Sequence, residues 1–169
     1  PEKLFDLGYG MYCKIAGEID RGRPQSECDD PWPALSTKQQ REMDEAVAMT
    51  REAADQDHMG AQACCGNVYE LGWGVVKDER LALVYYEKAA KQGAVVSQYN
   101  TGVCYANGRG CDQNYKRAAE WLEKAARAGD TDAMASLGRL YYFGYGVPQS
   151  FERAVELYKQ GVAQGNPVR

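Results

Sequence analysis

Residues 133–146, AMASLGRLYYFGYG, hold the pattern that decides the fold, because two earlier stretches of the chain repeat it. Residues 97–110, SQYNTGVCYANGRG, and residues 61–74, AQACCGNVYELGWG, place Gly, Tyr and Gly-x-Gly at the same positions, 36 residues apart. A fixed period of roughly 20 to 50 residues is the signature of a solenoid built from stacked helical or strand units. We therefore expect each 36-residue unit to be one structural repeat.

Each repeat is expected to contain two helices. The first segments, 61–71, 97–107 and 133–143, have the apolar spacing of a short helix and end in Gly-x-Gly, which can adopt the positive φ angles that stop a helix. The next helix then begins after a residue that favours helix N-caps in all three copies: Asp78, Asn114 and Ser150. A glycine closes that helix in each copy: Gly93, Gly129 and Gly165.

Residues 1–59 contain a stretched and divergent version of the same unit. Residues 3–20 predict a first helix, and Ser36-x-x-Gln39 predicts a capping box at the start of a second helix that ends at Asp57. Between them lies a long Pro- and Asp-rich loop, residues 21–35. We expect this half-matching unit and three full repeats, at about 61–96, 97–132 and 133–168, to form one continuous solenoid of about three and a half repeats.

Composition excludes several classes of protein. Hydrophobic residues make up 44% and charged residues 26%, which is ordinary for a globular domain, and no apolar run is long enough to span a bilayer. The net charge of −4 argues against binding to nucleic acid. Six cysteines without a CxxC motif argue against structural zinc, and we expect reduced thiols, with disulfides as the alternative. The sequence favours a cytoplasmic or organellar location over secretion.

The repeated pattern resembles the SEL-like (Sel-one-like) repeat, a relative of the tetratricopeptide repeat. Ala133–Gly146 followed by Val147, and Ala82–Gly93 with its sequence ALVYYEKAAKQG, carry the resemblance. It implies an all-α, right-handed α/α superhelical solenoid. Such proteins act mainly as adaptors and scaffolds, although a cysteine-rich bacterial branch has been linked to β-lactam binding. The cysteines of that branch recur in every repeat, whereas the counterparts of Cys64 and Cys104 one repeat later are Asn100 and Leu140.

Catalytic chemistry finds little support in the sequence. His58 is the only histidine, no nucleophile motif accompanies it, and the Gly-x-Gly steps do not continue as phosphate-binding loops. The tyrosines 69, 105 and 141 recur once per repeat and are expected to pack between repeats rather than to hold a ligand. We therefore predict a protein that is not an enzyme, with no catalytic, cofactor-binding or metal-binding residues.

A partner protein is expected to bind the first helices of the repeats, which line the concave side of such a solenoid. Amide, aromatic and charged groups at those positions suit an extended peptide, whose backbone needs donors and acceptors. The predicted contact residues are Gln62, Asn67, Glu70, Gln98, Tyr99, Asn107, Arg139, Tyr142 and Phe143.

Three functional hypotheses follow. The first is a non-enzymatic scaffold or adaptor that binds a segment of a protein partner on this face. The second is a structural subunit of a large assembly, such as an organellar membrane complex, because the array stops at Arg169 where another first helix would begin and the 21–35 loop is long. The third is a β-lactam-binding or hydrolase-like protein, by analogy with the cysteine-rich branch. None of the three calls for nucleic acid or a membrane span.

Overall fold

The computed structural model describes residues 1–21 and 35–164, and these residues form eight α-helices without strands. The chain divides into two compact units, Pro1–Asp78 and Glu79–Arg169. The boundary between the units lies within the first expected repeat, residues 61–96. Within the described residues no helix is long and apolar enough to cross a membrane.

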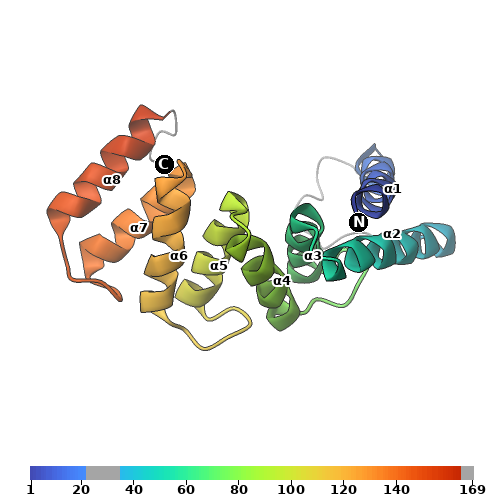
Figure 1. Ribbon diagram of the computed structural model, residues 1–169, viewed down its shortest axis with the longest axis horizontal. Helices are drawn as coiled ribbons and strands as arrows, with labels where there is room; N and C mark the ends of the chain where they lie inside the picture. The colour runs from blue at the N-terminus through green and yellow to red at the C-terminus, as the bar shows by residue number, and fades with distance from the viewer. Residues whose placement is uncertain (22–34, 165–169) are drawn as a thin grey trace. The chain divides into compact units, whose positions relative to one another are not determined.

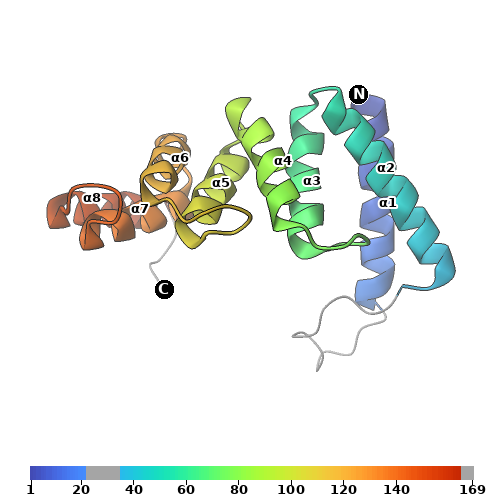
Figure 2. The same ribbon diagram turned by 90° about the horizontal axis from the view of Figure 1, so that it is seen from below.

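Unit 1 contains three helices. Helix α1 spans Glu2–Arg21, α2 spans Thr37–Asp55 and α3 spans Met59–Leu71. In this unit α1 packs against α2, and α2 packs against α3 (Figures 1 and 2). The core between them is built from both apolar and small side chains: Tyr12, Ile15, Met43, Ala46, Val47 and Val68.

Unit 2 contains the other five helices, which alternate in the order that the repeat predicts. They are α4 (Glu79–Lys91), α5 (Val95–Asn107), α6 (Tyr115–Arg127), α7 (Thr131–Phe143) and α8 (Phe151–Ala163). Each packs on the next along the chain, as the green-to-red part of Figure 1 shows. All five are 13 residues long, and small buried alanines on the second helices, such as Ala118 and Ala154, let neighbouring helices approach closely.

The predicted helix starts at Asn114 and Ser150 are confirmed, whereas Gly165, the predicted stop of the last helix, lies outside the described residues. Asn114 and Ser150 cap α6 and α8 by accepting hydrogen bonds from the third backbone N–H of each helix. The Ser36–Gln39 capping box begins α2. Gly108 and Gly110, which bracket the turn after α5, both have φ of 72°, a left-handed conformation that glycine adopts without strain.

The second glycine of this turn has an additional role. A Cβ atom on Gly110 would collide with the backbone of Glu79 at the start of α4, whereas a Cβ on Gly108 would make ordinary contacts of 3.4–3.5 Å. Gly146 lies in the same way against the backbone of Tyr115 and Lys116 at the start of α6. Each turn therefore lies against the start of the second helix of the preceding repeat, which is α4 for the turn of Gly110 and α6 for the turn of Gly146.

Helices α1 and α2 pair in the register of the full repeats. A Cβ on Gly8 would lie 2.8 Å from Ala46 O and from Thr50 Oγ1, just as a Cβ on Gly102 would meet Leu122 and Ala118 O. Gly8 precedes Ala46 by 38 residues, whereas Gly102 precedes Ala118 by 16. Of the 22 extra residues, 14 lengthen the two helices and 8 lengthen the connection, which has 15 residues against 7 between α5 and α6. Of the predicted 21–35 loop, residues 22–34 lie outside the described residues.

Candidate interaction site

Two of the predicted contact residues belong to the joints between helices. The side chain of Gln62 is fully buried, and its amide donates to Ala54 O at 3.2 Å and to Asp57 Oδ1 at 3.3 Å. Gln98, 36 residues later, donates to the equivalent carbonyl, Ala90 O, at 3.2 Å. These amides cap the carboxyl ends of α2 and α4, where carbonyls lack partners inside the helix. The burial of Gln62 excludes it from a contact surface, whereas the half-exposed Gln98 remains a predicted contact residue.

Four other predicted residues have intermediate or full exposure. Tyr99 on α5 is partly buried, and its pKa is raised, first by burial and then by the negative charge of Asp132 on α7. Asn107 is exposed at the end of α5. Asn67 and Glu70 are half-buried on α3 in unit 1. These residues remain predictions of a contact face.

The remaining three predicted residues lie together on α7. Arg139 is exposed, and one turn later Tyr142 and Phe143 are 46% and 52% exposed, with ring centroids 4.9 Å apart in an edge-to-face arrangement. They belong to a contiguous set of rings from α6, α7, α8 and the α7–α8 turn, which we call the aromatic cluster: Tyr115, Tyr142, Phe143, Tyr145 and Phe151.

The rings of the aromatic cluster contact one another in a continuous series. Tyr145 stacks on Tyr115 at 4.9 Å and on Phe143 at 5.4 Å, while Phe151 meets Tyr142 edge-on at 5.2 Å. Tyr145 and Phe151 are 45% and 56% exposed. Single exposed apolar residues are common on proteins, but contiguous aromatic patches mark binding surfaces.

Local chemistry holds the aromatic cluster in place. Gly144 ends α7 with a left-handed φ of 71°, and Gly146 brings the turn against Tyr115. The amide of Gln149 donates to Tyr142 O at 2.9 Å, which fixes the turn on the end of α7. The aromatic cluster is thus built on helix ends and a hydrogen-bonded turn.

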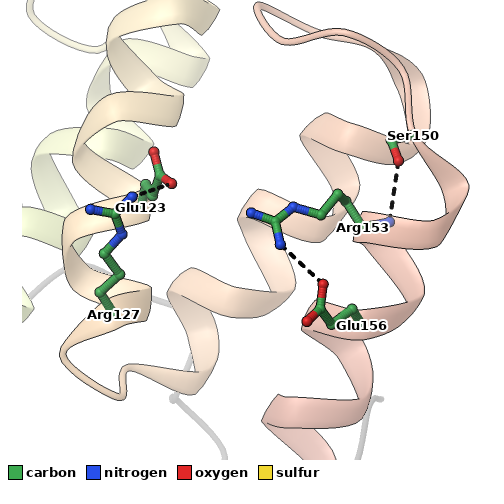
Figure 3. Close-up of polar contacts among 5 residues, drawn as sticks. All are labelled: Glu123, Arg127, Ser150, Arg153 and Glu156. Carbon is green, nitrogen blue, oxygen red and sulfur yellow. Dashed lines mark hydrogen bonds and ion pairs between the residues drawn. The ribbon is translucent and has the colours of Figure 1, made fainter.

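A second surface feature is a cavity of about 150 Å³ between α6 and α8, with α7 as its floor. We call it the α6–α8 groove. Its walls carry two charge pairs, each on one helix: Arg127 Nη2 lies 2.8 Å from Glu123 Oε1 on α6, and Arg153 Nη1 lies 3.1 Å from Glu156 Oε2 on α8 (Figure 3). Its apolar lining comes from Ala126, Leu137 and Leu157, with Tyr141 and Gln160 beside them.

The preceding repeat shows the same residue types in a closed arrangement, which we call the α4–α6 bridge. Arg117 on α6 donates to the hydroxyl of Tyr105 on α5 at 3.0 Å, and this hydroxyl donates to Glu87 on α4 at 2.6 Å. Burial, followed by the hydrogen bond to Glu87, raises the pKa of Tyr105. The expectation that the recurring tyrosines are packing residues is met here, since Tyr105 is buried and its hydroxyl has partners.

Sequence reasoning did not single out the walls of the groove, although a signal for them exists. Glu123, Tyr141 and Arg153 stand 36 residues after Glu87, Tyr105 and Arg117. An acid, a hydroxyl and a base that recur together in one register indicate a polar connection between neighbouring repeats. In the α6–α8 groove, Arg153 pairs with Glu156 of its own helix and also bonds to Tyr141 on α7, while Glu123 pairs with Arg127 of its own helix.

Histidine and cysteine have structural roles where they are described. His58 caps the start of α3, where its Nδ1 accepts a hydrogen bond from Ala61 N at 3.1 Å, rather than extending α2, which ends at Asp55. The five cysteines in the described ranges are free thiols: Cys13, Cys64, Cys65, Cys104 and Cys111. Cys28 lies outside those ranges. In the same ranges, no group of three His, Cys, Asp or Glu residues could hold a metal ion.

The family model described as the Sel1 repeat matches residues 61–93, 95–130 and 131–166. The chain belongs to the Sel1 repeat family. Its matched segments coincide with the three repeats expected from the 36-residue period, and the all-α repeat solenoid is confirmed. Sel1 repeat proteins generally act as protein–protein interaction scaffolds without catalytic activity.

Solved structures of Sel1-type proteins resemble this chain. A Sel1 repeat protein from Oxalobacter formigenes is 32% identical with a TM-score of 0.66, over 73% of this chain and 49% of that protein. The protein c5321, a protective antigen of uropathogenic Escherichia coli with an SLR fold, is 28% identical with a TM-score of 0.71, over 96% of this chain and 38% of c5321. This Sel1 chain therefore spans half or less of either relative.

A third structure shows the fold alone. Cysteine rich protein B of Helicobacter pylori is 21% identical with a TM-score of 0.58, over 78% of this Sel1 chain and 92% of that protein. No curated protein matches the chain significantly.

Proposed function

We propose that this Sel1 repeat protein is a non-enzymatic scaffold that holds a segment of a partner protein against Arg139 and the aromatic cluster. The observation that carries the proposal is the continuous series of rings with four members exposed by 45–56%. Large aromatic side chains and arginine supply most of the energy at protein interfaces, because they bury much area at little entropic cost.

The chemistry of this surface fits a protein segment better than a small molecule. The rings present both faces and edges over three helices, and Arg139 adds a cation one turn before Tyr142. A partner segment with apolar side chains and an acidic group would use both features. The other predicted residues on unit 2, Gln98, Tyr99 and Asn107, extend the proposed contact face along α5.

The test is affinity purification of the protein from its native source, followed by crosslinking and quantitative mass spectrometry. A variant that carries Arg139→Glu, Tyr142→Ser and Phe143→Ser should lose the partner by tenfold or more, since hot-spot residues each contribute about 2 kcal/mol or more. Its helicity and melting should stay unchanged, because all three side chains are exposed. The matched control is Val96→Ser on α5, which replaces another exposed apolar residue, 64% exposed, outside the aromatic cluster.

Two outcomes would contradict the proposal. Recovery of the partner by the triple variant would place the interface elsewhere. Crosslinks to many different subunits, retained in the variant, would support the alternative of a structural subunit in a large assembly.

A further inference from the structure

One face of α8 carries apolar side chains around an open pocket of about 360 Å³. We call it the α8 face, and it is formed by Val155, Tyr158, Lys159, Val162 and Ala163. Val155 and Val162 are 49% and 51% exposed. Helix α8 packs on α7, and within the described residues no further helix follows it (Figure 1). Neighbouring exposed apolar side chains of this kind mark a surface that another element can cover.

The earlier repeats show what kind of element covers this face. The positions of Val155 and Val162 recur every 36 residues in the other second helices, and each of those helices packs against the first helix that follows it. The residues at these positions are all buried: Val47 and Ala54 on α2, Leu83 and Ala90 on α4, and Ala119 and Ala126 on α6. The α8 face therefore continues the helix–helix interfaces inside the array, and its occupant should be a helix.

The first helices show which of their positions face the preceding second helix. On α5, Gln98 donates to Ala90 O of α4, and Tyr105, seven residues later, donates to Glu87 of the same helix. On α7, Leu137 and Tyr141 line a groove together with residues of α6. Positions i, i+3 and i+7 lie on one side of a helix. A helix that covers α8 in the same way should therefore present apolar residues at i and i+3 and a polar residue at i+7.

Lys159 determines which polar group fits at i+7. In the two preceding repeats this position of the second helix holds a glutamate, and the carboxylate of Glu87 accepts from the Tyr105 hydroxyl. A lysine ammonium can only donate hydrogen bonds, so it cannot serve as that acceptor. A cation on the docking helix would be repelled by Lys159, whereas a carboxylate at i+7 would pair with it.

The first repeat follows the same charge rule in its sequence. Arg51 on α2 stands 36 residues before Glu87, so this position also holds a cation there. The residue that corresponds to Arg117 is then Leu81. A cation at the position of Lys159 is thus accompanied by the loss of the arginine that follows a glutamate in the other repeats.

We propose that the α8 face binds an amphipathic helix of a partner protein, with apolar residues at i and i+3 and an aspartate or glutamate at i+7 opposite Lys159. The inference goes beyond the scaffold function proposed for the aromatic cluster, since it assigns a second surface and a helical, acidic partner. Burial of Val155 and Val162 supplies the affinity, and the ion pair supplies the preference for an acid.

The probe is a synthetic helix with the sequence of α7, TDAMASLGRLYYF, in which Tyr141→Glu places the acid at i+7 from Met134. A hydrocarbon staple on the opposite side keeps this short peptide helical, because isolated helices of this length are marginal in water. The peptide is titrated into the intact protein and followed by NMR of side-chain methyl groups. Saturable shifts are expected at Val155 and Val162. The same peptide with Tyr141→Lys should bind at least about fivefold more weakly.

Two variants of the protein test the face and its charge. Val162→Asp should weaken binding of the acidic peptide at least about tenfold, because a carboxylate enters an apolar contact, and its circular dichroism spectrum should stay unchanged. The matched control is Val84→Asp on α4, a similarly exposed valine outside the α8 face, which should bind the peptide normally. Lys159→Glu should reverse the order of the acidic and basic peptides.

The proposal is overturned if the acidic peptide does not bind, if the basic peptide binds equally well, or if Val162→Asp binds the acidic peptide normally. Sedimentation of the protein alone tests a second copy as the occupant, and self-association that Val162→Asp abolishes would also overturn it. The triple variant of the aromatic cluster should bind the peptide as the unmodified protein does. Loss of the partner in that variant, with no peptide binding in the unmodified protein, would refute the α8 face alone.

Discussion

Replacement of Gly110 by alanine should destabilise the protein far more than the same change at Gly108. Both glycines have φ of 72°, so both alanines would pay for a left-handed conformation, which costs roughly 1–2 kcal/mol for an L-residue. Only at Gly110 would the new methyl group also collide with backbone, that of Glu79 at the start of α4. Overpacking of this kind adds about 1–3 kcal/mol.

The expected free-energy losses are therefore about 1–2 kcal/mol for Gly108→Ala and about 2–5 kcal/mol for Gly110→Ala. At about 2–4 °C per kcal/mol for a chain of this length, the two melting temperatures should differ by several degrees. Urea unfolding followed by circular dichroism measures both, and Gly108→Ala serves as the matched control for the backbone conformation.

Equal losses of stability for the two variants would refute this reasoning. They would mean that the turn after α5 moves away from α4 at little cost, and that backbone conformation alone determines the effect. The pair Gly144 and Gly146 allows an independent repetition, because Gly146 lies against the backbone of Tyr115 in the same manner.

Two further predictions concern polar and titratable groups. Tyr105→Phe should cost about 1 kcal/mol because it breaks two hydrogen bonds, to Arg117 and to Glu87, and urea unfolding should show a smaller loss for Tyr141→Phe, whose hydroxyl bonds Arg153 while Glu123 pairs with Arg127; equal losses would contradict this reasoning. Burial raises the pKa of the Cys64 thiol from its ordinary value of 9.0 to about 11, so the folded state keeps this proton longer than the unfolded state does. The thiol's contribution is therefore complete below pH 9 and is lost as the pH rises to 11, by about 1.4 kcal/mol per pKa unit, and the unfolding free energy relative to Cys64→Ser should fall over that range rather than stay constant.

The helices and their ends could be predicted because each signal is local and recurs. A glycine acts through its own left-handed backbone, and an Asn or Ser at a helix start acts through its side chain on a backbone N–H three residues later. Both effects are local, so the 36-residue pattern places these residues without knowledge of the packing. The place of residues 1–21 in the repeat pattern was harder to predict, because only Leu7-Gly8 matches the repeat. The contact of Gly8 with Ala46 and Thr50 now places α1 in the same register.

The contact surface was harder to predict, because residues on the same turn of a helix can either pack against a neighbouring helix or face a partner. Gln62 was expected to face a partner, but it is buried and its amide donates to Ala54 O, an acceptor that comes within reach only when the helix ends meet. The half-exposed Gln98 makes the equivalent bond to Ala90 O and remains a predicted contact. The grooves show the same difficulty. Tyr105 and Tyr141 are equivalent in sequence, yet Tyr105 links Arg117 to Glu87, whereas Tyr141 bonds Arg153 and lines a cavity.

The register of α1 on α2 has a practical consequence for engineering. The connection between α1 and α2 has 15 residues against 7 between α5 and α6, yet the two helix pairs keep the same register, and doubling the length of a loop costs only about 0.6 kcal/mol. The connection between the two helices of a repeat should therefore tolerate insertions. Reporter peptides, epitopes or small domains inserted between α1 and α2 should leave the fold intact and should not alter the surfaces on α6, α7 and α8.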